Sequence, residues 1–222
     1  MRTPIRKREL PDYTKREELL NVFTHIAGAV LAAAVLVLSL LKSTAKGNAW
    51  GVVSTAIYGA SMMMVFTISA VYHGLRPGTA KKVLQVIDHC DIYFLIAGTY
   101  TPIVLVAVRP VSPILSWVVF GVEWGMAALG ITLNAIDLKK YRHFSMICYL
   151  VMGWCVLTCL RPTIGAMTWT GFLLLLSGGV AYTLGALLYQ IGKKKRYFHS
   201  LFHVFVVLGA ALQAGSIYWF VL

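Results

Sequence analysis

The sequence is poor in charged side chains. Of its 222 residues, 13% are Asp, Glu, Lys or Arg and 59% are hydrophobic, whereas soluble domains contain about 25% charged and roughly 45–50% apolar residues. A chain of this length in water could not bury so much apolar surface, because small domains leave a large share of their surface exposed. The composition excludes a soluble, disordered, collagen-like or disulfide-built chain. It predicts an integral membrane protein.

Acidic residues and cysteine motifs are also scarce. Eight Asp and Glu stand against twenty Lys and Arg, a net charge of +12. The basic residues form short clusters between apolar runs, a pattern that orients membrane helices, so we expect no nucleic-acid partner. The four cysteines form no Cys-x-x-Cys motif, so neither a zinc knuckle nor a redox pair is indicated. No apolar run precedes Asn21, and we therefore expect no cleavable signal peptide.

Long apolar runs are abundant instead. A helix needs about 20 apolar residues to cross the hydrocarbon core, and seven runs approach or exceed that length. They cover 21–41, 49–73, 84–107, 112–134, 144–160, 166–191 and 199–221. Their residues do not alternate as the strands of a membrane β-barrel would. The sequence predicts an all-α fold, with a basic cytoplasmic segment over 1–20 and a bundle of seven transmembrane helices over 21–222.

The basic residues predict how this bundle is oriented. With the N-terminus in the cytoplasm, sixteen of the twenty Lys and Arg fall on the cytoplasmic side. These are Arg2, Arg6, Lys7, Arg8, Lys15, Arg16, Arg76, Lys81, Lys82, Lys139, Lys140, Arg142, Lys193, Lys194, Lys195 and Arg196. The outer segments hold Lys42, Lys46, Arg109 and Arg161. The bias predicts a multi-pass protein of the cell's inner (plasma) membrane with its C-terminus outside.

Histidines at the predicted cytoplasmic helix ends are candidate metal ligands. His199 and His203 are four residues apart, which places both on one helix face, as two ligands of one metal ion require. His73 could be a third ligand, with Ser69 one turn before it. Three histidines and an open fourth position are typical of catalytic zinc. The alternative is that His199 and His203 bond to water or backbone, and that Ser69 bonds to its own helix or a neighbouring one.

Carboxylates inside apolar runs are costly and therefore suggest function. Asp88 lies where the third run begins, and it could bond a zinc-bound water or take its proton. Asp91, one turn on, could be an alternative base, a residue that orients a metal ligand, or a buried partner of a histidine. Glu123, inside the fourth run, could be a protonated group bonded to a neighbouring helix or part of a proton or ion path.

Several motifs, in order along essentially the whole chain, resemble the bacterial hemolysin III proteins of the progesterone and adipoQ receptor family. The motifs are ELLNVFTH, SAVYH, IDHCDIYFLIAGTYTP and HSLFH. The resemblance implies a seven-helix bundle, inverted relative to G-protein-coupled receptors, with a zinc ion near the cytoplasmic face. It carries the zinc ligands onto His73, His199 and His203, the aspartate beside the zinc-bound water onto Asp88, and the motif serine onto Ser69.

The motif of the first helix receives no role from this resemblance. Its polar residues are Glu18, Asn21, Thr24 and His25. On physical grounds alone, Asn21 or Thr24 would cap the helix.

The same resemblance also implies a small set of possible functions. Animal relatives look like lipid-linked receptors with ceramide amidase activity, the wider superfamily contains alkaline ceramidases, and bacterial members are connected with lysis and with membrane fatty-acid balance. We therefore expect a zinc-dependent hydrolase of lipid amides or a lipid sensor, with Asp88 as the base, Ser69 in a positioning role and membrane lipids as partners. The alternatives are a pore-forming cytolysin of the hemolysin III type and a receptor-like protein with a structural zinc site. Substrate and oligomeric state stay open.

Overall fold

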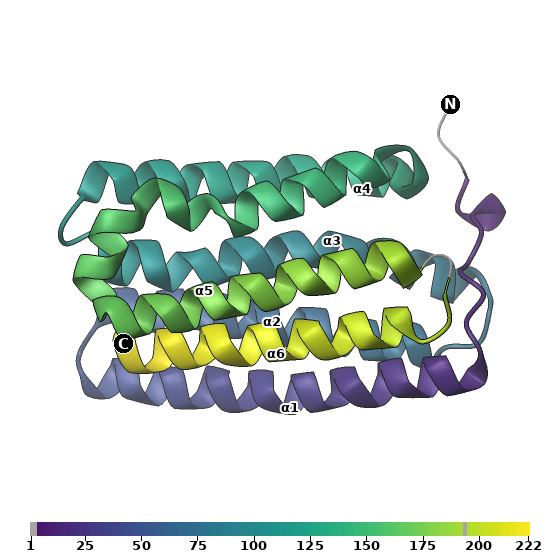
Figure 1. Ribbon diagram of the computed structural model, residues 1–222, viewed down its shortest axis with the longest axis horizontal. Coiled ribbons are helices and arrows are strands. Elements are labelled where there is room, and N and C mark those ends of the chain that lie inside the picture. The colour runs from purple at the N-terminus through teal and green to yellow at the C-terminus, as the bar shows by residue number, and fades with distance from the viewer. Residues whose placement is uncertain (1–3, 193–194) are drawn as a thin grey trace.

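The computed structural model describes residues 4–192 and 195–222, and over these ranges the chain is helical with no strand (Figure 1). The long helices are α1 (Lys15–Ala45), α2 (Ala49–Gly74), α3 (Thr79–Pro102), α4 (Pro113–Gly153), α5 (Leu160–Gly192) and α6 (Phe198–Phe220). Three short helical segments are η1 (Ile5–Lys7), η2 (Ile103–Val108) and η3 (Cys155–Cys159). The predicted all-α fold is confirmed. Arg2, Lys193 and Lys194, which the orientation argument used, lie outside the described residues.

Five stretches of the described chain are long and apolar enough to cross a membrane. They are α1, α2, α3 continued by η2, the run Pro113–Gly192 and α6. Helix α6 packs against both α5 and α1, so the last helix lies beside the first (Figure 1). The packing of α1 against α6 brings side chains of both helices, among them His25 and His203, into contact.

Helix α1 begins at Lys15, before the first apolar run. Thr14 is its N-cap: the hydroxyl accepts the N–H of Glu17 at 3.2 Å, and the Glu17 carboxylate accepts the N–H of Thr14 at 2.8 Å. This reciprocal capping box satisfies two donors that a helix start leaves open. The prediction that Asn21 or Thr24 caps the helix is therefore wrong, because both positions already lie inside it.

The chain reverses direction inside α4, at Asp137. This residue leaves the helical conformation (φ −157°, ψ 99°), and its carboxylate accepts the N–H groups of Lys139 and Lys140, each at 3.1 Å. Asp137 thus caps a second helical half. Ser145 donates to Asn134 at 2.6 Å, although eleven residues of straight helix would separate them by about 16 Å. The two halves of α4 therefore form a hairpin.

The passage from α4 to α5 differs from the predicted run over 144–160. Helix α4 ends at Gly153, and the chain continues through η3 into α5. A second break follows at Thr168, whose backbone has φ 65° and ψ 165°. The Thr168 hydroxyl accepts the N–H of Gly171 at 3.5 Å, so the long part of α5 starts after Thr168. The chain between the runs predicted over 144–160 and 166–191 is therefore a short helical connection.

Tyr100 of α3 fixes the turn at the end of α4. Its hydroxyl donates to the carbonyl of Gly153 at 3.1 Å and accepts the N–H of Val156 at 2.6 Å. Backbone groups that leave a helix inside an apolar environment need such a partner, because no water is available. Tyr100 therefore joins α3 to the connection between α4 and η3.

Replacing Tyr100 by Phe should lower the free energy of unfolding by about 1–3 kcal/mol, because a backbone donor and acceptor would stay buried without a partner. The decrease can be measured as a lower apparent Tm in detergent. Tyr182→Phe is the matched control: its buried hydroxyl has no hydrogen-bond partner among the described residues, and its loss should leave Tm nearly unchanged. Equal Tm values for the two variants would contradict the role of Tyr100.

Candidate metal centre

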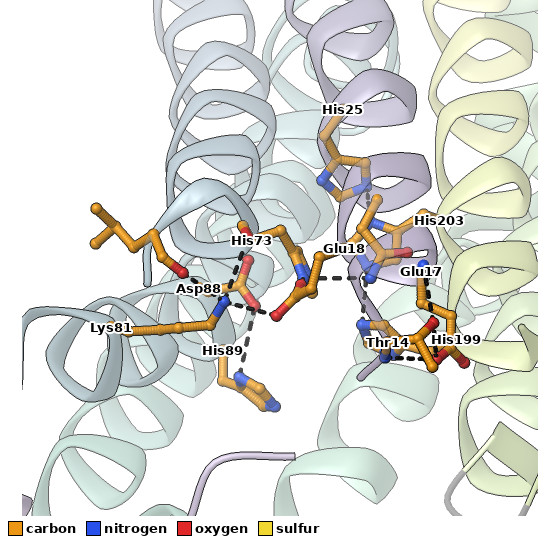
Figure 2. Close-up of polar contacts among 12 residues, drawn as sticks. Thr14, Glu17, Glu18, His25, His73, Lys81, Asp88, His89, His199 and His203 are labelled. Carbon is orange, nitrogen blue, oxygen red and sulfur yellow. Dashed lines mark hydrogen bonds and ion pairs between the residues drawn. The ribbon is translucent and has the colours of Figure 1, made fainter. Parts of the chain in front are cut away.

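Helices α2 and α6 bring three histidines together at one end of the bundle. His73 is in the last turn of α2, and His199 and His203 are in the first turns of α6. One ligand nitrogen from each lies within 4.8 Å of the other two, an arrangement that could hold a metal ion (Figure 2). His73 and His203 are each only 2% exposed. The structure thus assembles the three histidines that the sequence analysis selected.

The hydrogen bonds of these rings fit a ligand role. His73 Nδ1 lies 2.6 Å from Glu18 Oε2, and its other nitrogen, Nε2, is buried without a hydrogen-bond partner among the described residues. A metal-binding imidazole has this arrangement, with one N–H held by a carboxylate and the opposite lone pair free. The Nε2 atoms of His199 and His203 face each other at 2.9 Å. Three imidazole donors suit zinc and similar transition metals.

Helix α1 contributes residues that the sequence analysis left without a role. Glu18 contacts His73, and the side-chain amide of Asn21 lies 3.2 Å from the same ring nitrogen. His25 Nε2 lies 2.6 Å from His203 Nδ1. The sequence does indicate that these residues act together, because spacings of three and seven place Glu18, Asn21 and His25 on one helix face. What that face contacts could not be read from spacing.

Ser69 and Asp88 open onto the same cavity as His25, His199 and His203. Ser69 is one turn before His73 on α2, and Asp88 is on α3, with a carboxylate oxygen 3.7 Å from His89 Nδ1. The candidate base and the candidate serine therefore share one cavity with two of the predicted ligands. Asp91 and Glu123 are both buried, at 1% and 0% exposed, but neither lines this cavity.

The cavity has a volume of about 840 Å³, within the range of small-molecule sites. Along α6 its lining reaches from His199 to Gln213, a rise of roughly 20 Å at 1.5 Å per residue. Beyond the polar end its walls are mainly apolar side chains of α3, α5 and α6, among them Leu95, Leu175 and Val206. The space suits a long apolar group with its polar end near the histidines.

The segment before α1 also lines this cavity, through residues between Lys7 and Tyr13. Tyr13 stacks on His199, with ring centroids 4.7 Å apart and planes at 17°, and burial raises the pKa of its hydroxyl, which stays protonated. Asp12 pairs with Arg196 at 3.3 Å, and Glu9 with Lys139 at 3.4 Å. Residues of this segment therefore lie beside the histidines and pair with charged groups of α4 and of the chain before α6.

Comparison with known proteins assigns the family. Residues 13–214 match the family described as Haemolysin-III related. The chain belongs to the haemolysin-III-related family. The resemblance found in the sequence motifs is thereby confirmed, and a haemolysin-III-related chain with apolar helices of this length is a membrane protein.

Three haemolysin-III-related or similar proteins show how far the likeness extends. Hemolysin-3 of Bacillus cereus is 33% identical over 93% of this chain and 93% of its own length. The Hemolysin-3 homolog of Bacillus subtilis (strain 168) is 35% identical over 90% and 92%. The human Monocyte to macrophage differentiation factor is 28% identical over 98% of this chain and 89% of its own.

Proposed function

We propose that this protein is a zinc-dependent hydrolase of lipid amides. The observation that carries the proposal is one large apolar cavity whose polar end collects a histidine cluster, a carboxylate and a serine. His73, His199 and His203 would hold the ion. Zinc bound there would polarise the amide carbonyl and make water a stronger nucleophile.

The remaining groups divide the chemistry between them. Asp88 takes the proton of the water whose oxygen bonds to the carbonyl carbon, and it returns a proton to the amine as the C–N bond breaks. The Ser69 hydroxyl is a positioning group for the water or the carbonyl oxygen. The apolar walls hold the acyl chain and keep bulk water away from the polar end, which fixes the direction in which the substrate lies.

The proposal includes a topology of seven crossings. These are α1, α2, α3 with η2, the two halves of α4, α5 after Thr168, and α6. The reversal at Asp137 supports the count, because it splits α4 into two antiparallel segments. The excess of Lys and Arg in the segments at the histidine end supports a cytoplasmic N-terminus and a zinc site near the cytoplasmic face of the plasma membrane.

Zinc content is the direct test of the site. The parent protein, purified in detergent without chelator, should carry about one zinc per chain, because three imidazoles converge there. His73→Ala, His199→Ala and His203→Ala should each lose most of it. His143→Ala is the control, since His143 is exposed and outside the cluster. A parent protein without zinc, or His variants that keep it, would contradict the proposal.

Two assays separate the proposal from its alternatives. A receptor-like protein or sensor with structural zinc would bind the ion and release no fatty acid from ceramide or an N-acyl ethanolamine in mixed micelles. The relatives named Hemolysin-3 make lysis the second alternative. Leakage of liposomes that survives His199→Ala would favour a cytolysin, whereas zinc-dependent release of fatty acid supports the hydrolase.

A further inference from the structure

Glu18 of α1 links two buried groups at the edge of the metal centre (Figure 2). One carboxylate oxygen lies 2.6 Å from His73 Nδ1, and the other lies 2.6 Å from Lys81 Nζ. Lys81 is only 4% exposed. It also donates to the carbonyls of His73 and Leu75, at 3.2 Å and 2.9 Å. The carboxylate is therefore held on both sides, by His73 and by Lys81.

The Glu18 contact with His73 Nδ1, 2.6 Å against 3.2 Å for the Asn21 amide nitrogen, is the shorter of the two and decides which ring nitrogen carries the proton. An ionised carboxylate only accepts hydrogen bonds, so the bond requires a proton on Nδ1 and leaves the lone pair on Nε2. Lys81, itself buried, contributes the opposite charge to the partly buried Glu18 carboxylate. Glu18 and His73 thus have the geometry of a carboxylate that orients a metal-binding histidine.

A second contact from α1 does the same for His203. Its Nδ1 lies 2.6 Å from His25 Nε2, with ring centroids 3.9 Å apart. If His203 offers Nε2 to the ion, its Nδ1–H must be the donor and His25 the acceptor. His25 follows Glu18 by seven residues, two helical turns on the same face. One face of α1 therefore contacts two of the three candidate ligands.

We propose that Glu18 and His25 are positioning residues of the metal centre, setting the tautomer and ring orientation of His73 and His203. Lys81 keeps Glu18 in place. This inference rests on the metal site proposed above and goes beyond it, because it assigns a role to the first-helix motif. It makes α1 part of the metal centre although α1 supplies none of the three proposed ligands.

The test for Glu18 compares two double variants that both remove the buried ion pair. Glu18→Leu/Lys81→Met has no hydrogen-bond acceptor at position 18, whereas Glu18→Gln/Lys81→Met keeps a carboxamide oxygen of similar reach. Zinc affinity is measured on the metal-stripped full-length protein by competition with a chromogenic chelator. We expect about 10–100-fold weaker binding in the Leu variant and substantial recovery in the Gln variant. Cobalt(II) absorption spectra should report altered ligand geometry in the Leu variant alone.

His25 is tested in the same way. His25→Phe should weaken zinc binding by about 10–100-fold, and His25→Gln, which retains an acceptor, should restore much of it. Thr24→Val is the matched control on α1, because Thr24 is hydrogen-bonded to Leu20 of its own helix. This pair also keeps the inference testable if a Glu18 variant fails to fold.

The outcomes distinguish this inference from the proposed function. A parent protein that binds no zinc refutes the metal site and the inference with it. A parent that binds zinc, together with Leu and Phe variants of unchanged affinity, refutes the inference and leaves the metal site standing. Equal loss in the Gln and Leu variants also refutes it, because the hydrogen-bond acceptor would then not be the cause.

Discussion

Asp88→Asn should keep the zinc of the parent protein and lower kcat/KM for hydrolysis of a lipid amide by about 10²–10⁴-fold, the usual contribution of a general base. Asparagine has nearly the same shape as aspartate but cannot take a proton from water. Because Asp88 lines the cavity together with His199 and His203, its loss removes the proposed base without removing a ligand. Fatty acid released per zinc is the quantity to measure.

Asp91→Asn provides the control for this experiment. Asp91 is one turn away on α3 and buried, but it does not line the cavity. Its variant should hydrolyse the lipid amide at the rate of the parent protein. If the two variants lost activity equally, or if Asp88→Asn kept full activity, Asp88 would not be the base.

Gly178→Leu should destabilise the protein by about 3 kcal/mol or more, as overpacking does where the backbone cannot move aside. A Cβ atom at Gly178 would lie 2.9 Å from the backbone oxygen of Gly209 and 2.5 Å from Cγ of Gln213. Helix α6 would have to move away from α5. Since α6 carries His199 and His203, we expect a large decrease in apparent Tm accompanied by weaker zinc binding.

Gly121→Leu is the corresponding control. Gly121 is an exposed glycine inside α4, and a Cβ there meets nothing within 4 Å. Leucine also has a higher helix propensity than glycine, so Tm should stay equal or rise slightly. A Gly178→Leu protein with the Tm and zinc content of the parent would contradict the close approach of α5 and α6.

The helices with long apolar runs could be predicted closely from the sequence. The run over 49–73 corresponds to Ala49–Gly74, and the run over 199–221 corresponds to Phe198–Phe220. Apolar composition predicts where these helices begin and end, because a membrane helix must be apolar over most of its length. The start of α1 was missed because its capping box is polar and precedes the apolar run. The connection after Gly153 was missed because it is itself helical and apolar.

The candidate site was predicted in part for a similar reason. The spacing of His199 and His203 is local, so periodicity places them on one face. The contact between Glu18 and His73 joins residues 55 positions apart, and no local pattern encodes it. The choice between Asp88 and Asp91 depends on how α3 is rotated in the bundle. That rotation follows from packing against α2 and α4 rather than from residue type.

The candidate metal ligands and much of the apolar cavity wall come from different helices. His73 is on α2, and His199 and His203 are in the first turns of α6, whereas much of the apolar lining is on α3, α4 and α5. Substitutions in the lining on α3, α4 and α5 can therefore change which chain length or branching fits without replacing a candidate ligand. In evolutionary terms, such a bundle can diversify its ligand range while its histidine cluster is inherited unchanged.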